Sequence, residues 1–236
     1  MTTPPEISVV IPIYNEAAIL ETAVRGLVSR LSSRGWPFEL ILSENGSTDD
    51  TAQIAAALAR ELPNVRALHD RAPNYGRALR VGILAARGDI VVCDEIDLGD
   101  LDFYARALTA LQHGADLVVG SKRHPESLDG RPWLRRQGTA VMSALLQVAL
   151  DFKGTDTHGL KAFKREALLP VLERCVVEHH LLASELVIRA SRMGLVVEEI
   201  PLRLREIRPP SVGLLRRVPH VLTDLARLTY VIRFRK

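Results

Sequence analysis

The stretch GDIVVCDEIDLGD, residues 88–100, joins a short apolar run to a dense group of carboxylates. Residues 90–93 are apolar and rich in β-branched side chains, which is typical of a strand that is buried on both faces. Asp94, Glu95, Asp97 and Asp100 follow this run. Hard divalent cations prefer carboxylate oxygens as ligands. The stretch therefore predicts either a solvated acidic turn after a buried strand, or a site where a cation meets an anionic ligand.

Strand and helix patterns alternate around this stretch. Apolar, β-branched runs predict strands at residues 8–13, 38–43, 65–70, 89–95 and 115–121. Helical spacing of apolar residues predicts helices at 17–31, at 47–62 with Ser47 or Thr48 as the N-cap, at 74–88 and at 100–112. Such alternation is the pattern of an α/β fold, in which helices flank both faces of a mostly parallel sheet.

Four polar segments each follow a predicted strand. They are YNE (14–16), SENGS (43–47), DEID (94–97) and GSKRHPE (120–126). Ligands of open α/β sheets bind outside the carboxyl ends of the strands. Because parallel strands end at the same edge of the sheet, we expect these four segments to line one cleft.

The second half of the chain is less regular. We expect a loop at 123–138, helices near 139–151, 165–173 and 181–193, and a strand at 195–206. No repeat or flexible linker divides the sequence. We therefore expect one domain over residues 1–211, followed by a C-terminal basic amphipathic helix over residues 212–236.

Composition indicates a globular protein with a substantial core, because 47% of the 236 residues are hydrophobic and 25% are charged. Cys93 and Cys175 stand in apolar surroundings and are expected to be buried free thiols, which suits a reducing compartment. No run approaches the roughly 18 apolar residues of a membrane helix, and the first residues lack a signal-peptide pattern. We expect a cytoplasmic protein.

The end of the chain is basic. Residues 203–236 hold nine lysines and arginines against two acidic residues. Apolar residues from Leu214 to Ile232 follow helical spacing, so this segment either lies on an anionic membrane surface, packs against its own domain, or mediates a homodimer. Nucleic acid is not an expected partner, because aromatic residues are few and no stacking platform is evident.

Three motifs carry a resemblance. SVVIPIYNE (8–16), ILSENGSTDDT (41–51) and GDIVVCDEIDL (88–98), in this order, resemble the start of a family 2 glycosyltransferase with the Rossmann-like GT-A fold. VVGSKRHPES (118–127) and TDTHGLKAFKRE (155–166) resemble the dolichyl- and polyprenyl-phosphate mannosyl- and glucosyltransferase branch. The resemblance implies inverting transfer of a sugar from a nucleoside-diphosphate sugar, of the GDP-mannose or UDP-glucose type, to a polyprenyl phosphate. The protein would then be peripheral at the cytoplasmic face of a membrane.

The resemblance also implies nucleotide-binding residues. The nucleoside would be held by Pro12, Tyr14, Asn15, Glu16 and Glu44. Asn15 and Glu16 have a second interpretation, which is capping of the first helix. Gly76 would allow the backbone to approach a phosphate or ribose closely. Arg77 either supports the nucleotide or is an ordinary arginine on the helix surface.

The metal motif of the family is Asp-x-Asp, and its positions correspond here to Glu95 and Asp97 when the motif is aligned on Leu98. Carboxylates at i and i+2 of an extended segment point to the same side, so they could hold one Mg²⁺ or Mn²⁺ ion against the diphosphate. Asp94 either joins the nucleotide site or turns toward the core. A solvated acidic turn and a site that has lost its chemistry are the alternatives.

Basic residues follow the fifth strand and open the next helix. By the resemblance, Lys122, Arg123, Arg135 and Arg136, together with Asp156, would form the acceptor-phosphate site, with Asp97, Lys122 and Arg135 as the catalytic groups. The alternative for the basic residues is a solvated face. A phosphate acceptor is already ionised near neutral pH and needs no general base. His158 is a weaker candidate for a ligand or base, and Glu185 is expected to be structural.

Two rival functions remain open at this point. A transferase of the same fold could act on a hydroxyl of a soluble or polymeric glycan. A non-catalytic sugar-nucleotide-binding protein would explain the departures from the family pattern at Glu44, Glu95 and His158. The sugar, the nucleotide, the lipid and the oligomeric state do not follow from the motifs.

Overall fold

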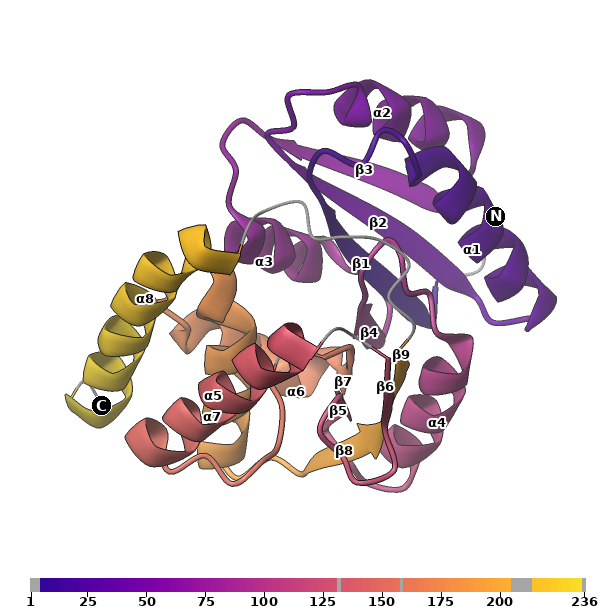
Figure 1. Ribbon diagram of the computed structural model, residues 1–236. Coiled ribbons are helices and arrows are strands. Elements are labelled where there is room, and N and C mark those ends of the chain that lie inside the picture. Colours follow the sequence, from indigo (N-terminus) through magenta and orange to yellow (C-terminus); the bar gives the residue numbers. More distant parts are fainter. Residues whose placement is uncertain (1–4, 131–132, 158, 205–213, 235–236) are drawn as a thin grey trace.

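The computed structural model describes residues 5–130, 133–157, 159–204 and 214–234. A seven-stranded sheet with the order β3-β2-β1-β4-β7-β5-β8 forms its centre (Figure 1). The strands are β1 (Ile7–Ile13), β2 (Phe38–Asn45), β3 (Val65–Asp70), β4 (Ile90–Cys93), β5 (Leu117–Ser121), β7 (Lys161–Lys164) and β8 (Val197–Pro201). Neighbouring strands are parallel except at β7, which runs antiparallel to both β4 and β5. The predicted α/β class with a mostly parallel sheet is confirmed.

Helices cover both faces of the sheet, as Figure 1 shows. One face packs against α1 (Leu20–Ser33), α2 (Thr51–Glu61) and α4 (Leu101–Gln112). The other face packs against α3 (Tyr75–Ala85), α5 (Trp133–Leu150), α6 (Arg165–Arg174), α7 (Leu182–Arg192) and α8 (Leu214–Phe234). A 3₁₀ turn, η1 (His179–Leu181), precedes α7, and β6 (Leu128–Asp129) pairs with β9 (Arg203–Leu204).

The apolar strands form two hydrophobic cores, one on each face of the sheet. Val9 belongs to the core under α1 and α4, whereas its neighbour Val10 belongs to the core under α3 and α7, and both are fully buried. Successive side chains of a strand point to opposite faces, so a strand covered on both sides must be apolar without interruption. This explains the continuous apolar runs in the sequence.

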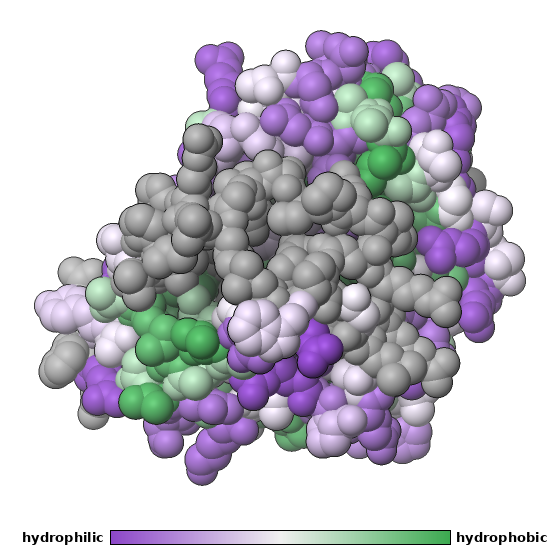
Figure 2. Space-filling model, in the orientation of Figure 1, coloured by the Kyte–Doolittle hydropathy of each residue, from purple (hydrophilic) through white to green (hydrophobic). Residues whose placement is uncertain are grey.

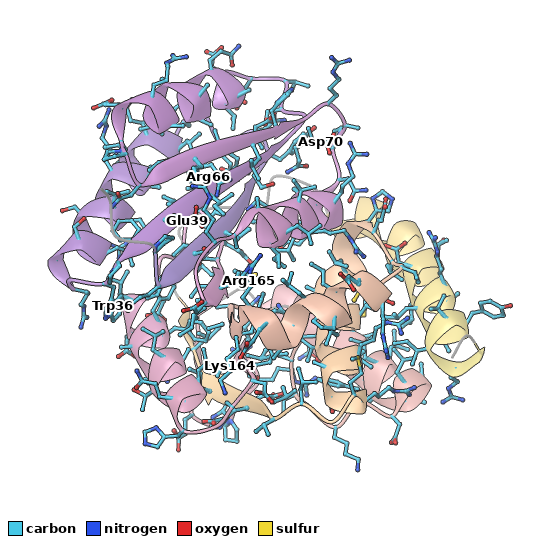
Figure 3. The ribbon with its side chains drawn as sticks, turned by 180° about the vertical axis from the view of Figure 1, so that it is seen from behind. Trp36, Glu39, Arg66, Asp70, Lys164 and Arg165 are labelled. Carbon is cyan, nitrogen blue, oxygen red and sulfur yellow. The ribbon has the colours of Figure 1, made fainter. Side chains whose placement is uncertain are left out.

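A polar cluster lies at the edge of the sheet formed by the amino ends of the parallel strands. Glu39 on β2 accepts hydrogen bonds from Ser8 on β1 and Arg66 on β3, each at 2.7 Å, and Figure 3 shows Glu39 and Arg66 together on these strands. Ser8 in turn accepts the backbone N–H of Gly88 at 2.8 Å. Because a buried carboxylate needs such partners, the cluster is a structural feature of the amino ends of the strands.

Several predicted boundaries are wrong. Helix α2 begins at Thr51 and not at Ser47 or Thr48, because the side chains of Ser47 and Asp49 bind the backbone of the β1–α1 loop. Helix α3 ends at Ala85 and not at 88, and α5 begins at Trp133 and not at 139. The predicted strand 195–206 is split between β8 and β9.

Strand β7 has no counterpart among the predicted elements. It contains only the four residues KAFK, which is too short for a periodicity to be recognised.

Cys93 and Cys175 are buried free thiols, as expected, and burial raises the pKa of each to about 12. In the described ranges, none of the helices has the length and apolar character that crossing a membrane requires.

The predicted boundary between residues 211 and 212 lies outside the described residues, and the described part of the C-terminal segment is α8, which packs against the domain. Leu225, Leu228 and Val231 on α8 are buried, while Arg227 and Arg233 are exposed. Arg233 donates from Nε to the carbonyl of Ala149 at the end of α5 at 2.7 Å. The alternative in which this helix packs on its own domain is therefore the one that the described contacts favour.

Candidate active site

The β1–α1 and β2–α2 loops are tied together at the carboxyl edge of the sheet. Asn15 adopts a left-handed backbone conformation with φ of 55°, which asparagine tolerates better than most residues. Its Oδ1 accepts the N–H of Thr48 at 2.9 Å, and its own N–H donates to Oγ of Ser47 at 3.0 Å. Asn15 therefore does not cap α1, whose N-cap is Ile19 without a side-chain bond. It joins two of the four predicted segments.

Glu16 belongs to the same junction. Its N–H donates to Oγ1 of Thr51, the first residue of α2, at 2.7 Å. Its carbonyl accepts the N–H groups of Ile19 and Leu20, which form the first turn of α1. Pro12 and Tyr14 are half-buried beside it at the end of β1. The predicted cluster YNE thus lies where the sequence placed it, against the start of α2.

Glu44 is a buried carboxylate at the end of β2, with only 2% of its surface exposed. Its Oε1 accepts the N–H of Ser47 at 2.5 Å, and its Oε2 forms an ion-pair contact with Nδ1 of His69, the residue opposite it on β3. The His69 side chain is mostly exposed. Each carboxylate oxygen has a further lone pair, so Glu44 keeps the capacity to accept a bond from a ligand.

The start of α3 meets the segment before α7. Asn74 caps α3 by accepting the N–H of Arg77 at 3.0 Å, and the same Oδ1 accepts the N–H of His179 at 3.0 Å. A Cβ on Gly76 would lie 2.3 Å from the carbonyl oxygen of His179. The lack of a side chain at Gly76 is therefore explained by packing against His179. Close approach of a phosphate or ribose, the reason inferred from the sequence, is not needed to explain it.

Arg77 does not point into this junction. Its guanidinium forms a two-pronged ion pair with Asp70 at the end of β3, and this contact holds the pKa of Asp70 below its usual value. The Arg77 side chain is exposed. Of the two interpretations that the sequence left open, the structure supports an arginine on the helix surface.

The carboxylates after β4 have different environments. Asp94 is buried, accepts the N–H of Glu95 at 2.6 Å, and accepts the hydroxyl of Tyr104 on α4 at 2.5 Å. Burial raises the pKa of Asp94 to about 7, against the opposing effect of the Tyr104 hydrogen bond. Glu95 is exposed and Asp97 is half-buried. Asp94 is thus turned toward the core, which resolves its two alternatives.

Glu95 and Asp97 do not lie on an extended segment, as the sequence argument assumed. Strand β4 ends at Cys93, and the N–H of Leu98 donates to the carbonyl of Glu95 at 3.1 Å, which closes a turn over these residues. Asp100 caps α4 by accepting the N–H of Asp102 at 3.0 Å and of Phe103 at 3.1 Å. One of the four carboxylates is therefore a helix cap, and one is buried.

The remaining two carboxylates, Glu95 and Asp97, fit a cation only together with an anionic ligand. Across the residues that the structure describes, no group of three or more histidine, cysteine, aspartate and glutamate side chains is arranged to hold a metal ion. Mg²⁺ in nucleotide sites is characteristically bound by one or two carboxylates plus the phosphates of the substrate. Glu95 and Asp97 supply such a pair, so the donor set fits a cation shared with a diphosphate.

The acceptor-side residues gather at the end of β5. The N–H of Lys122 donates to Oδ2 of the buried Asp156 at 3.1 Å, so Asp156 holds the backbone of the basic segment. Arg123 donates to the carbonyl of Ala140 on α5 at 3.0 Å, and Arg136 is exposed on the same helix. Arg135 lies in the first turn of α5, but its side chain and the whole of His158 are outside the described residues.

Two features of this region were not predicted. The first is Lys161, the first residue of β7, which is buried between β4 and β5. A lysine inside the apolar run GLKAF is the signal that could have found it. The second is Glu199 on β8, which accepts the N–H of Thr155 at 2.7 Å and also its hydroxyl, and so fixes the loop before Asp156.

Glu185 is fully buried and accepts the N–H of Val177 at 2.7 Å, in agreement with its expected structural role.

The sheet topology, with polar segments at the strand ends, matches the fold of GT-A glycosyltransferases. The profile described as glycosyl transferase family 2 matches residues 8–170, and the chain belongs to this family. The predicted resemblance is confirmed, and the protein is a glycosyltransferase.

Two relatives share much of the chain. It is 33% identical to the glycosyltransferase AglD of Haloferax volcanii over 217 residues, which are 89% of this chain and 35% of AglD. It is 26% identical to the dolichyl-phosphate beta-glucosyltransferase ALG5A of Trichomonas vaginalis over 214 residues, which are 85% of this chain and 66% of that protein. The chain thus spans about a third of AglD and about two thirds of ALG5A.

One solved structure supports the fold. Glucosyl-3-phosphoglycerate synthase from Mycobacterium tuberculosis, in complex with Mn²⁺, UDP and glucosyl-3-phosphoglycerate, superposes with a TM-score of 0.69 over 97% of this chain and 80% of that one. The two sequences are 23% identical, so the likeness is one of fold.

Proposed function

We propose that the protein transfers a sugar, with inversion at C1, from a nucleoside-diphosphate sugar to the phosphate of a polyprenyl or dolichyl lipid. The observation that carries the proposal is the position of the basic segment. Arg123 is bonded to α5, and α5 carries an exposed apolar stripe, so a cationic site and an apolar surface adjoin. A lipid phosphate combines these two chemistries. The name of the relative ALG5A points to the same class of acceptor.

The stripe on α5 consists of Trp133, Val141, Leu145 and Val148, whose exposed fractions range from 38% to 81%. Figure 2 shows apolar residues gathered over the part of the surface where α5 lies in Figure 1. Exposed apolar patches of this kind mark contacts with membranes or with other proteins. The exposed Arg136 on the same helix supports an anionic membrane surface as the partner of this stripe, and the protein would then be peripheral to the membrane. A homodimer is the competing occupant.

The donor would bind where the first three polar segments meet. Asn15, Glu16 and Glu44 lie at this junction, and Glu44 can accept a bond from the base or ribose. Glu95 and Asp97 would hold Mg²⁺ or Mn²⁺ together with the diphosphate. When bound there, the metal neutralises the charge that develops on the leaving nucleoside diphosphate.

The reaction then needs positioning more than proton transfer. An oxygen of the acceptor phosphate attacks C1 of the sugar, and the bond from C1 to the diphosphate oxygen breaks on the opposite side. The nucleoside diphosphate leaves with the electron pair. The acceptor phosphate is already an anion near neutral pH, so no general base has to remove a proton. Lys122 and Arg123 would orient this phosphate, because ammonium and guanidinium groups bind phosphate oxygens with charge-assisted hydrogen bonds.

Transfer to an organic-soluble product tests the proposal directly. The protein is incubated with Mn²⁺ or Mg²⁺, a panel of radiolabelled sugar nucleotides, and either a polyprenyl phosphate or 3-phosphoglycerate. We expect metal-dependent label in the organic phase with the lipid. Asp97→Asn should abolish this transfer. Asp102 is an exposed carboxylate on α4, and Asp102→Asn should leave the transfer intact. Label that appears only in the water-soluble product would overturn the lipid acceptor, and nucleotide binding without any transfer would overturn the reaction.

A further inference from the structure

A lysine is buried at the point where the donor and acceptor halves of the site meet. Lys161 is 3% exposed and lies opposite Cys93 on β4 and Val119 on β5. Cys93 is the last residue of β4, directly before the carboxylate segment, and β5 ends at Ser121, directly before Lys122. Because β7 is antiparallel to both strands, its first residue is at their carboxyl ends. Lys161 therefore stands between the two rim segments.

The ammonium of Lys161 has few partners. Nζ donates to the carbonyl of Gly159 at 2.7 Å, and the described part of the chain contains no carboxylate in ion-pair contact with it. An ammonium group has three donors, and a buried charge without a paired anion is costly. Burial lowers the pKa of Lys161 to about 8, so the group remains mostly protonated near pH 7. The fold thus retains a buried positive charge, which the described part of the chain binds through the carbonyl of Gly159.

The charges that act on this ammonium come from both halves of the site. Besides burial, which lowers its pKa, Cys93, Asp156 and Glu95 favour its protonated form, while Lys122 opposes it. Asp156 is itself 1% exposed, and its Oδ2 accepts the N–H of Lys122. Asp156 therefore connects the segment before β7 to the start of the basic segment.

The backbone around these residues is tightly constrained. The N–H of Gly120 on β5 donates to the carbonyl of Leu160 at 2.8 Å. A Cβ on Gly159 would lie 1.7 Å from the carbonyl oxygen of Gly120, so no side chain fits there. Gly159 and Leu160 are therefore packed directly on the end of β5, where Lys122 begins the basic segment.

We propose that Lys161 is a positioning residue for the acceptor phosphate: its ammonium holds the carbonyl of Gly159 at the end of β5, and so keeps Asp156 in place to bind the backbone of Lys122 at the phosphate site. The inference rests on the proposed function for the identity of the ligand, which is a compound with a terminal phosphate. It assigns no contact between Lys161 and the substrate. The role follows from the order of the strands, because β7 pairs with both β4 and β5 in the described sheet.

The test separates acceptor binding from nucleotide binding. Lys161→Met removes the charge and keeps the length of the side chain. We expect at least a fivefold loss of affinity for a short-chain polyprenyl phosphate and for inorganic phosphate, with the affinity for UDP and Mn²⁺ changed less than twofold. Lys164→Met is the matched control on the same strand, because Lys164, which Figure 3 labels, lies at the other end of β7. Its Nζ is 3.5 Å from Oδ1 of Asp116. Lys164→Met should change neither affinity.

The route through Asp156 has its own test. If Lys161 acts through this carboxylate, the phosphate affinity of the double variant Lys161→Met/Asp156→Asn should equal that of Asp156→Asn alone. Additive losses would overturn the inference, as would Lys161→Met with unchanged phosphate affinity or with equal losses for phosphate and UDP. A wild-type protein that transfers no sugar to any acceptor would overturn the proposed function, while the phosphate-binding results would still decide the role of Lys161.

Discussion

The hydroxyl of Tyr104 donates a hydrogen bond of 2.5 Å to Oδ2 of Asp94, and both side chains are buried. This contact links the start of the acidic segment to α4. It removes Asp94 from the set of carboxylates that face a ligand, although the sequence makes Asp94 look equivalent to its neighbours. Glu95 and Asp97 remain as the proposed ligands of the cation. The orientation of the acidic turn therefore depends on a tyrosine ten residues away.

Tyr104→Phe should destabilise the protein by about 1–3 kcal/mol, because the buried Asp94 loses its side-chain donor and keeps the cost of its burial. Urea unfolding measures this change. Thr109→Val on the exposed side of the same helix removes a hydrogen bond to Ala105 and should stay within about 0.5 kcal/mol of wild type. Equal stability of Tyr104→Phe and wild type would show that the hydroxyl is not the partner of a buried carboxylate.

Gly76→Ala should be destabilising by about 1–3 kcal/mol, because the new methyl group would collide with the backbone of His179. Gly26 in α1 is the matched control, since a Cβ there meets nothing within 4 Å. Gly26→Ala should stabilise the protein by about 0.5–1 kcal/mol through helix propensity. The urea midpoints of the two variants should move in opposite directions. A tolerated Gly76→Ala with weakened nucleotide binding would instead restore the phosphate-approach interpretation.

Glu185→Ala should cost about 3–5 kcal/mol, because it leaves Arg189 without its buried partner and the N–H groups of Val176 and Val177 without an acceptor. Glu198→Ala, at an exposed position of β8, should have little effect. Thermal unfolding of the two variants gives the comparison. If Glu185→Ala were as stable as wild type but inactive, Glu185 would belong to the chemistry and not to the scaffold.

The stability of Lys161→Met relative to wild type should depend on pH. Burial lowers the pKa of Lys161 from 10.5 in the unfolded chain to about 8 in the folded protein. Between pH 8 and pH 10.5 the unfolded state binds more protons than the folded state at this group. The free energy of unfolding of the wild type therefore rises with pH in this range, and the variant lacks this rise. The stability of Lys161→Met relative to wild type should therefore be greatest at pH 7 and should fall by pH 10. A difference that stays constant from pH 7 to pH 10 would contradict a buried, titrating lysine.

Acidic substitutions on α5 should reduce binding to vesicles that contain phosphatidylglycerol. Val148→Glu and Leu145→Glu each remove apolar surface from the exposed stripe and add a charge that the anionic membrane repels. Burial of one such side chain is worth about 1.5–3 kcal/mol, so we expect at least a tenfold weaker partition coefficient for each. Val81→Glu and Leu84→Glu on α3 are the controls, because these residues are also exposed. Equal losses on both helices would exclude α5 as the membrane-facing surface.

Much of the fold followed from local patterns. The apolar runs at 8–13 and 38–43 predicted strands, and the structure has β1 and β2 there, because a strand covered on both faces requires an unbroken apolar sequence. The convergence of YNE and SENGS also followed, since parallel strands end at one edge. The start of α5 was missed, because Trp133 lies in a segment of arginines, proline and glycine whose composition is typical of a loop.

The sequence by itself determined the alternation of strands and helices, the edge of the sheet where the polar segments meet, and membership of the glycosyltransferase family. Each depends on periodicity or on short motifs that are contiguous in the chain. Only the tertiary structure decided that Asp94 faces Tyr104, that Gly76 makes room for His179, and that Lys161 stands between β4 and β5. These relationships join residues through the order of the strands and the packing of helices, and the energy of a buried charge or a steric contact depends on partners that no local pattern identifies.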